Sequence, residues 1–255
     1  MYKLYGIMGI IRLKNCFSTI ILLAGLTPAS ASASAQSHDC DYKIITGQLE
    51  MGSDEEKEAF VQLFGDRNTQ EKFDFYFHWY NIAHEYGHCI LDFQGQSTGK
   101  VEEEIMVNKF AVSFWRAAGF TDELSKLKSM LEKRLTTIPD PVPESCEFIS
   151  WYNDIWGSDL LISVPVYGYL QFKSILIAME EAEDLPSWFD KTGIDGFSEP
   201  ECTKFERYPL KADSSAKYLN DIQSYLMKTG IGIPTAEIEL IESPSTHCSQ
   251  KISFD

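Results

Sequence analysis

The pattern of hydrophobic positions predicts a mainly helical protein built around one buried helix. Residues 70–93 carry aromatic and aliphatic side chains that fall on every side of a helix, and a helix that is apolar all round lies in the middle of a domain. A second helix is predicted over 101–118, with Gly119 as its stop. A third begins near Pro165 in the apolar stretch 160–179, where interrupting polar residues favour a buried helix over a membrane span.

Shorter segments predict a small sheet and flanking helices. Residues 42–46 are typical of a short strand. Ser53 and, three residues later, Glu56 form a capping box that predicts a helix ending at Phe64, before Gly65. We therefore expect an α+β, mainly helical fold with a small sheet. The remaining predicted elements are helices over 122–134, 145–156 and 216–228, a loop region over 180–197 and an extended segment over 231–241.

The first 35 residues predict a secretory signal peptide. Lys3, Arg12 and Lys14 give a positive start without any acidic residue, residues 16–26 are mostly apolar, and residues 27–35 contain two small-x-small cleavage sites. The apolar run is far shorter than the roughly 20 residues of a membrane-spanning helix. We expect a secreted or periplasmic protein with no stable membrane insertion once the signal is removed.

Removal of the signal leaves residues 36–255, a length that suits one domain. Three positive charges and no negative ones are lost, so the net charge changes from −16 to about −19. Such an acidic chain repels nucleic acid and anionic membrane surfaces, and we expect no nucleic-acid partner. Within the domain, the strongest motifs fall in residues 70–118, and residues 145–255 are expected to form a helical C-terminal part.

Five cysteines follow the signal segment, which predicts up to two disulfides in an oxidising compartment. Cys89 lies inside the buried helix and is expected to be the free thiol. The pairing of Cys40, Cys146, Cys202 and Cys248 cannot be read from their positions. Because no Cys-x-x-Cys spacing occurs, a cysteine zinc site is disfavoured.

The buried helix contains the motif His-Glu-x-x-His at residues 84–88. Side chains four apart share a helix face, so His84 and His88 can reach one metal ion. Glu85 projects about 100° away and can act on a water molecule without being a ligand. Two helix histidines satisfied by polar neighbours are the alternative. Burial among aromatic residues disfavours it, because buried polar groups without partners are costly.

The second helix offers a third ligand. Glu104 and Asn108 are four residues apart and share a face, so Glu104 is a candidate metal ligand and Asn108 an outer partner for a ligating histidine. Three consecutive glutamates are also typical of a solvated first turn that complements the helix dipole. We expect that description to fit Glu102 and Glu103, and to fit Glu104 less well because it borders an apolar stretch.

These motifs resemble the gluzincin-type zinc metallopeptidases, in which a His-Glu-x-x-His helix is followed by a helix that carries a glutamate ligand. The sequence Glu104-Ile-Met-Val-Asn108-Lys-Phe110-Ala111 is similar to the Glu-x-x-Ala-Asn/Asp-x-Phe-Ala pattern of ImmA/IrrE-like peptidases, with Val107 in place of Ala. The resemblance covers about residues 70–118. It implies a zincin-like domain with a central active-site helix and one Zn²⁺ held by the two motif histidines and Glu104.

Other residues fit the roles of ligand or catalytic group less well. A three-histidine site is disfavoured because Leu91 and Gln94 stand where that type requires Gly and His. The remaining histidines have no ligand-like spacing and are expected to be ordinary; they are His38, His78 and His247. Tyr167 or Tyr169 can supply an oxyanion donor if either faces the site, although packing is the commoner role of a tyrosine.

The sequence thus predicts an exported zinc metallopeptidase acting on a peptide or protein substrate. Zinc would lower the pKa of its water towards ~7, and Glu85 would take the proton and return it to the leaving amine. The main alternative is a non-catalytic metal-binding or protein-binding protein on a degenerate peptidase fold, against which the presence of Glu85 counts. A hydrolase that acts on a non-peptide bond is a further alternative.

Overall fold

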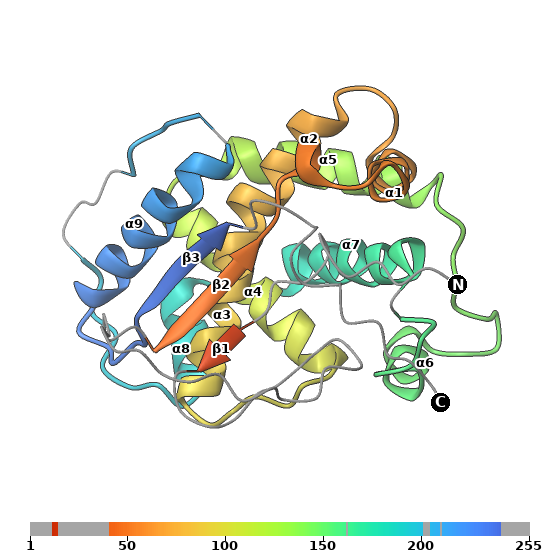
Figure 1. Ribbon diagram of the computed structural model, residues 1–255. Coiled ribbons are helices and arrows are strands. Elements are labelled where there is room, and N and C mark those ends of the chain that lie inside the picture. Colours follow the sequence, from red (N-terminus) through yellow and green to blue (C-terminus); the bar gives the residue numbers. More distant parts are fainter. Residues whose placement is uncertain (1–11, 15–40, 162, 201–204, 210, 241–255) are drawn as a thin grey trace, which may run out of the picture.

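The predicted buried helix forms the axis of the molecule (Figure 1). The computed structural model describes residues 12–14, 41–161, 163–200, 205–209 and 211–240. The axis consists of α2 (Thr69–Phe75), a π-helical turn η2 (Tyr76–Tyr80) and α3 (Asn81–Phe93), which follow one another without a break. All five residues of η2 and nearly all of α3 are buried, as expected for a helix that is apolar on every side.

A small mixed sheet covers one side of this axis. Its strands are β1 (Arg12–Lys14), β2 (Tyr42–Thr46) and β3 (Ala236–Leu240), in the order β1-β2-β3. The central strand β2 runs antiparallel to β1 and parallel to β3. The strand predicted over 42–46 is thereby confirmed. β1 falls within the segment 1–35 predicted as a signal peptide, and the rest of that segment lies outside the described residues.

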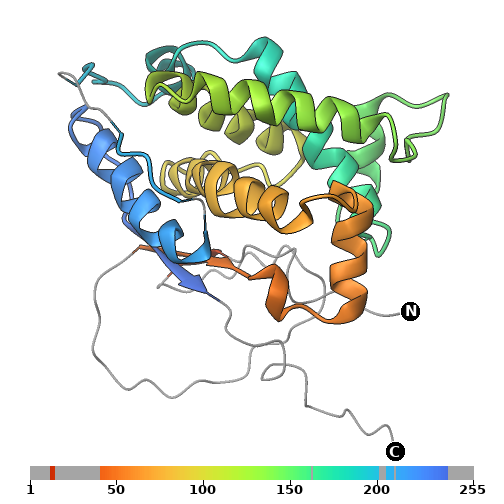
Figure 2. The same cartoon turned by 90° about the horizontal axis from the view of Figure 1, so that it is seen from above.

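Hydrogen bonds attach the sheet to the helices. Tyr42 of β2 donates to Asp92 Oδ2 of α3 at 2.7 Å, and Tyr86 of α3 donates to the carbonyl of Pro234 at 2.6 Å. Helix α9 (Ser215–Met227) packs on β3, where the Gln223 amide bonds both backbone groups of Ala236. Figure 2 shows the sheet with the helices on one side of it.

Two long helices complete the layer on the other side of the axis. Helix α4 (Val101–Ala117) packs between α3 and α7 (Val164–Glu181), which carries a proline in its first turn as predicted. The capping box of Ser53 and Glu56 is confirmed by both of its hydrogen bonds. Among the described helices, none is long and apolar enough to cross a membrane. The other helical elements are η1 (Leu49–Met51), α1 (Asp54–Phe64), α5 (Thr121–Leu135), α6 (Phe148–Asp154), α8 (Leu185–Lys191) and η3 (Ala212–Ser214).

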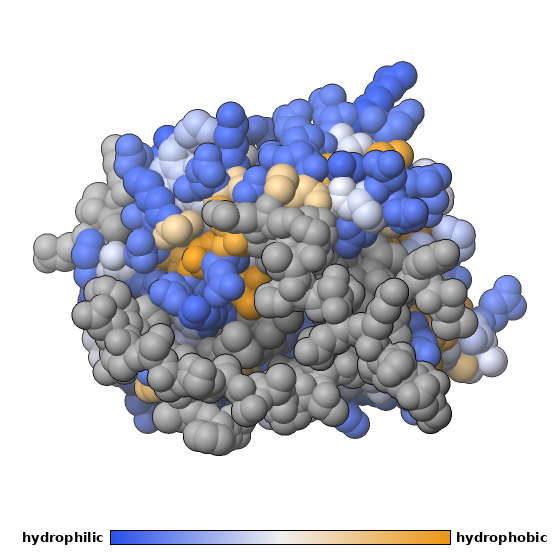
Figure 3. Space-filling view, viewed as in Figure 1, coloured by the Kyte–Doolittle hydropathy of each residue, from blue (hydrophilic) through white to orange (hydrophobic). Residues whose placement is uncertain are grey.

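Helix α8 corrects the prediction of a loop over 180–197. The Asp184 side chain caps this helix by accepting a hydrogen bond from Ser187 N, and Trp188 and Phe189 are buried against α4. The charged residues on both sides of this short apolar turn concealed its hydrophobic pattern. The mainly helical α+β class holds, and the described surface in Figure 3 is largely hydrophilic, in keeping with the acidic composition.

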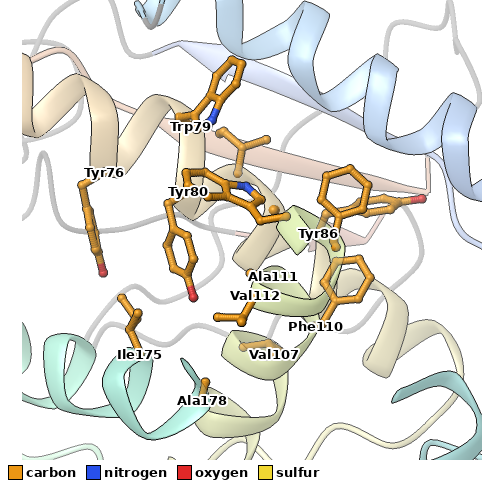
Figure 4. Packing of buried hydrophobic residues seen from close by; sticks show 14 of the residues in the cluster. Tyr76, Trp79, Tyr80, Tyr86, Val107, Phe110, Ala111, Val112, Ile175 and Ala178 are labelled. Carbon is orange, nitrogen blue, oxygen red and sulfur yellow. The ribbon is translucent and has the colours of Figure 1, made fainter. Parts of the chain in front are cut away.

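Aromatic side chains of the axis, among them Tyr76, Trp79 and Tyr80, lie in the core (Figure 4). Trp79 of η2 stacks on Tyr218 of α9 with ring centroids 4.3 Å apart, and the hydroxyl of Tyr218 accepts a hydrogen bond from Trp115 Nε1 at 2.8 Å. Trp115 in turn contacts Tyr80 edge-on. Since η2, α4 and α9 each contribute a ring, the helix that leads into residues 84–88 is held from two sides.

Helices α3 and α4 approach each other closely at Gly87. A Cβ atom at this position would lie 2.9 Å from the ring of Phe110 and 3.2 Å from Cβ of Val107. Neither neighbour can move away easily, because Phe110 presents a rigid ring and Val107 is branched at Cβ, the atom that would be touched. The glycine of the motif therefore sets the spacing between the two helices.

Replacing this glycine tests that constraint. We expect Gly87→Ala to lower the free energy of unfolding by about 1–3 kcal/mol, because overpacking forces the helices apart. Chemical denaturation measures the change. Gly232→Ala is the control, since a Cβ there meets nothing within 4 Å. A Gly87→Ala protein as stable as Gly232→Ala would contradict the role given to this contact.

The buried histidine of η2 gives a pH-dependent stability. His78 is fully buried, with Nδ1 3.3 Å from Ser215 Oγ and Nε2 3.6 Å from Asp74 Oδ1. Burial lowers its pKa to about 4, although the charges of Glu50 and Asp213 act in the opposite direction. An ordinary histidine on the surface or with satisfied nitrogens was expected here; instead His78 is buried, and its Nε2 has no hydrogen-bond partner among the described residues.

The difference in stability between wild type and His78→Gln isolates this effect. The unfolded chain takes up a proton near pH 6.5 and the folded chain only near pH 4, so wild type loses stability as the pH falls through this window. Between pH 7 and pH 4, the free energy of unfolding of wild type should fall by about 3 kcal/mol more than that of His78→Gln. Urea titrations that give the same difference in unfolding free energy at every pH would refute this effect of His78.

Candidate metal centre

The two motif histidines of α3 face the carboxylate of Glu104 in α4. Nε2 of His84 lies 3.3 Å from Glu104 Oε2, and Nε2 of His88 lies 3.5 Å from Glu104 Oε1. Zinc bonds of about 2.0–2.2 Å place neighbouring ligand atoms of a tetrahedral site about 3.3–3.6 Å apart. The spacing of these donors therefore fits a zinc ion held by two imidazoles and one carboxylate.

Glu85 lies beside the two histidines. His84, Glu85 and His88 offer ligand atoms that all lie within 4.8 Å of one another, and all three side chains are buried. Oε1 of Glu85 is 3.7 Å from Nε2 of His84. Glu85 is thus close enough to act on a molecule bound beside His84, while Glu104 occupies the position opposite both histidines.

The outer nitrogen of His84 is held by Asn108. Oδ1 of Asn108 lies 2.9 Å from Nδ1 of His84 and also accepts a hydrogen bond from the Tyr80 hydroxyl at 3.0 Å. An amide oxygen only accepts, so Nδ1 of His84 donates to Asn108, and Nε2 is the nitrogen that faces Glu104. Asn108 therefore contacts a motif histidine, as its position four residues after Glu104 predicted.

The outer nitrogen of His88 is held by Glu103, and here the sequence interpretation was wrong. Glu103 was expected on a solvated first turn, but only 3 % of it is exposed, and its Oε1 lies 2.6 Å from Nδ1 of His88. Its other oxygen accepts hydrogen bonds from Ser97 Oγ, Thr98 N and Gly99 N. Glu103 therefore links the loop before α4 to the second histidine.

A signal for Glu103 was present in the helical spacing. The residues four and seven positions later, Val107 and Phe110, are apolar and buried, so Glu103 lies on the buried face. Burial raises the pKa of Glu103, but the hydrogen bond and charge of His88 and the donors at Gly99 and Ser97 lower it more, to about 2. The carboxylate stays ionised and can orient His88.

Glu104 is held from a third helix. Gln171 of α7 donates from Nε2 to Glu104 Oε2 at 2.9 Å, and both side chains are buried. Burial by itself raises the pKa of Glu104, but the charges and hydrogen bonds of His88 and His84 outweigh it and hold the pKa well below its usual value. Glu104 is thus an ionised carboxylate surrounded by donors, which is the state a metal ligand requires.

The two candidate tyrosines of α7 are in different places. Burial raises the pKa of Tyr167, and the nearby charges of Glu104 and Glu85 raise it further, so Tyr167 lies near the centre. Tyr169 projects about 200° around the helix from Tyr167 and donates to Asp140 Oδ2 at 2.6 Å. Its hydroxyl is engaged in the connector before α6, which leaves Tyr167 as the candidate donor.

Tyr76 is a further tyrosine near the centre that the sequence pattern did not indicate. Burial raises its pKa, and the charges of Glu104 and Glu85 raise it further. It lies in the π-helical turn (Figure 4), whose wider winding alters the faces that side chains share. A regular helical count along residues 70–93 therefore gives the wrong direction for this ring.

The other predicted candidates contribute nothing that the structure describes at this centre. His38 and His247 lie outside the described residues, as do Cys40, Cys202 and Cys248. Cys146 is exposed and forms no disulfide with any described residue, and Cys89 is buried in α3. The expected disulfides therefore stay predictions.

Comparison with known proteins adds no assignment. No protein-family model, curated protein or solved structure matches the chain. The chemistry of the centre is therefore inferred from its donors alone, which are imidazole and carboxylate groups that could hold a metal ion.

The role of Glu103 can be tested by metal binding. We expect wild type to bind about one Zn²⁺ per chain. Glu103→Gln should weaken the zinc affinity by about 10–100-fold, because it replaces the carboxylate that orients His88 with a neutral amide. Competition with a chromophoric chelator measures the affinity.

Glu102→Gln is the matched control for this test, since Glu102 is on the same turn but is exposed and accepts from Asn153. His84→Ala should abolish tight binding. Equal affinities for the two glutamine variants would remove Glu103 from the centre.

Proposed function

We propose that the chain is an exported zinc-dependent metallopeptidase with a zincin-like active site. The observation that carries the proposal is the spacing of three donors: both Nε2 atoms face the two oxygens of one buried carboxylate at 3.3 and 3.5 Å. Three protein ligands leave one position of a tetrahedral ion for a water or a substrate, which is the arrangement of catalytic zinc sites, whereas structural sites are closed by four protein ligands.

His84, His88 and Glu104 would hold the ion, and Asn108 and Glu103 would orient the two imidazoles. When bound, zinc supplies a Lewis acid that polarises a carbonyl and brings the pKa of a water molecule to about 7. The protein contributes buried side chains whose hydrogen bonds fix their orientation, and preorganised groups of this kind strengthen such effects. The two helices set the donors before any ligand arrives, since each donor has a second hydrogen-bonding partner.

Glu85 is the proposed general base. It lies beside His84 without being needed as a ligand, so its carboxylate can take a proton from the attacking water and pass it to the departing amine of a peptide. Tyr167 is the proposed donor to the oxyanion that forms as the carbonyl is attacked. Glu85 is buried and Tyr167 is half-buried, and the low dielectric around the carboxylate strengthens its interactions.

A non-catalytic metal-binding protein is the alternative. The two interpretations differ in the role of Glu85. A catalytic site needs a general base, whereas a structural site needs no carboxylate beyond its ligands. Hydrolysis of a non-peptide bond would use the same groups and differs only in the substrate.

Glu85→Gln separates these readings. We expect the variant to keep its zinc and to lose peptide hydrolysis by about 10²–10⁴-fold, the contribution of a general acid–base group. Cleavage of a peptide library followed by mass spectrometry gives the activity, and metal analysis gives the zinc content.

Glu58→Gln is the control, because Glu58 is exposed on α1 and its substitution should change neither zinc content nor cleavage. Wild type that holds zinc and cleaves no peptide would favour the binding protein. Wild type without zinc would overturn the metal centre itself.

A further inference from the structure

We propose that Gln171 of α7 is the positioning residue that holds Glu104 in its orientation towards the two histidines. The inference rests on the proposed metal centre and does not require that the centre hydrolyses peptides. It assigns a role to a third helix, which lies outside the two helices that carry the predicted ligands.

The direction of the Gln171 amide follows from its partner. Nε2 of Gln171 donates to Oε2 of Glu104 at 2.9 Å, since a carboxylate oxygen is an acceptor and the amide oxygen cannot donate to it. This orientation leaves Oε1 buried and without a hydrogen-bond partner among the described residues. A buried acceptor without a partner is destabilising, and the contact with Glu104 is the interaction that keeps the amide in this orientation.

Gln171 also completes the set of contacts around Glu104. Oε2 of Glu104 faces both His84 Nε2 and Gln171 Nε2, and Oε1 faces His88. Without Gln171, the carboxylate would be directed only by the imidazoles that it must share with the ion. A donor from a third helix fixes the carboxylate whether or not the ion is bound.

Zinc affinity of two variants tests the proposal. Gln171→Met keeps the volume and removes the amide, and Gln171→Asn keeps the amide but shortens the side chain by one methylene. We expect both to bind Zn²⁺ about 10–100-fold more weakly than wild type, the range for outer partners of metal ligands. Ser174→Ala is the matched control: it removes another buried group of α7 that lacks a partner among the described residues, and its affinity should equal that of wild type.

A spectroscopic measurement separates positioning from a general loss of structure. Visible absorption of the Co²⁺-loaded protein reports the coordination geometry, and we expect it to change in Gln171→Met and to stay unchanged in Ser174→Ala. Wild-type affinity and an unchanged Co²⁺ spectrum in both Gln171 variants would overturn the proposal. Zinc binding without peptide cleavage by wild type would overturn only the peptidase, and the role of Gln171 would still be decided by these two measurements.

Discussion

The structure depends on one electrostatic constraint, the burial of ionisable groups in an aromatic core. His84, His88, Glu103 and Glu104 are each at most 5 % exposed, where an unpaired charge or an unmet hydrogen bond is strongly unfavourable. Each of these side chains is matched to another: Asn108 and Glu103 take the outer nitrogens, and Glu104 faces the inner ones. Such a network is stabilising only when all its members are present.

Packing of the helices serves this network. The glycine between the two histidines allows α4 to approach α3 until the carboxylate of Glu104 reaches both imidazoles. The Trp79–Tyr218 stack and the Trp115 hydrogen bond hold η2, α4 and α9 together on the side away from α7. Because interiors are close-packed and barely compressible, a small displacement at any of these contacts is transmitted to the donor spacing.

Short-range patterns were sufficient to predict the elements that carry the centre. The capping box at Ser53, the strand at residues 42–46 and the helices around residues 84–88 and 104–108 follow from spacing and local chemistry alone. Interactions between distant residues were not readable in this way. Gln171 reaches Glu104 across 67 positions, and nothing local distinguishes it from a polar residue on a surface turn. Glu103 was misread because three glutamates in a first turn are usually solvated.

The charges of the centre argue for a cation. Glu103 and Glu104 both have their pKa values lowered by the histidines that they contact, and Glu85 adds a third carboxyl group within the same buried volume. If the imidazoles carry the compensating protons, they cannot act as ligands, since ligation needs a neutral ring. A divalent ion compensates the same carboxylates and leaves both rings neutral. The metal that we propose, in place of these two protons, would balance the carboxylates and leave both imidazoles able to bind it.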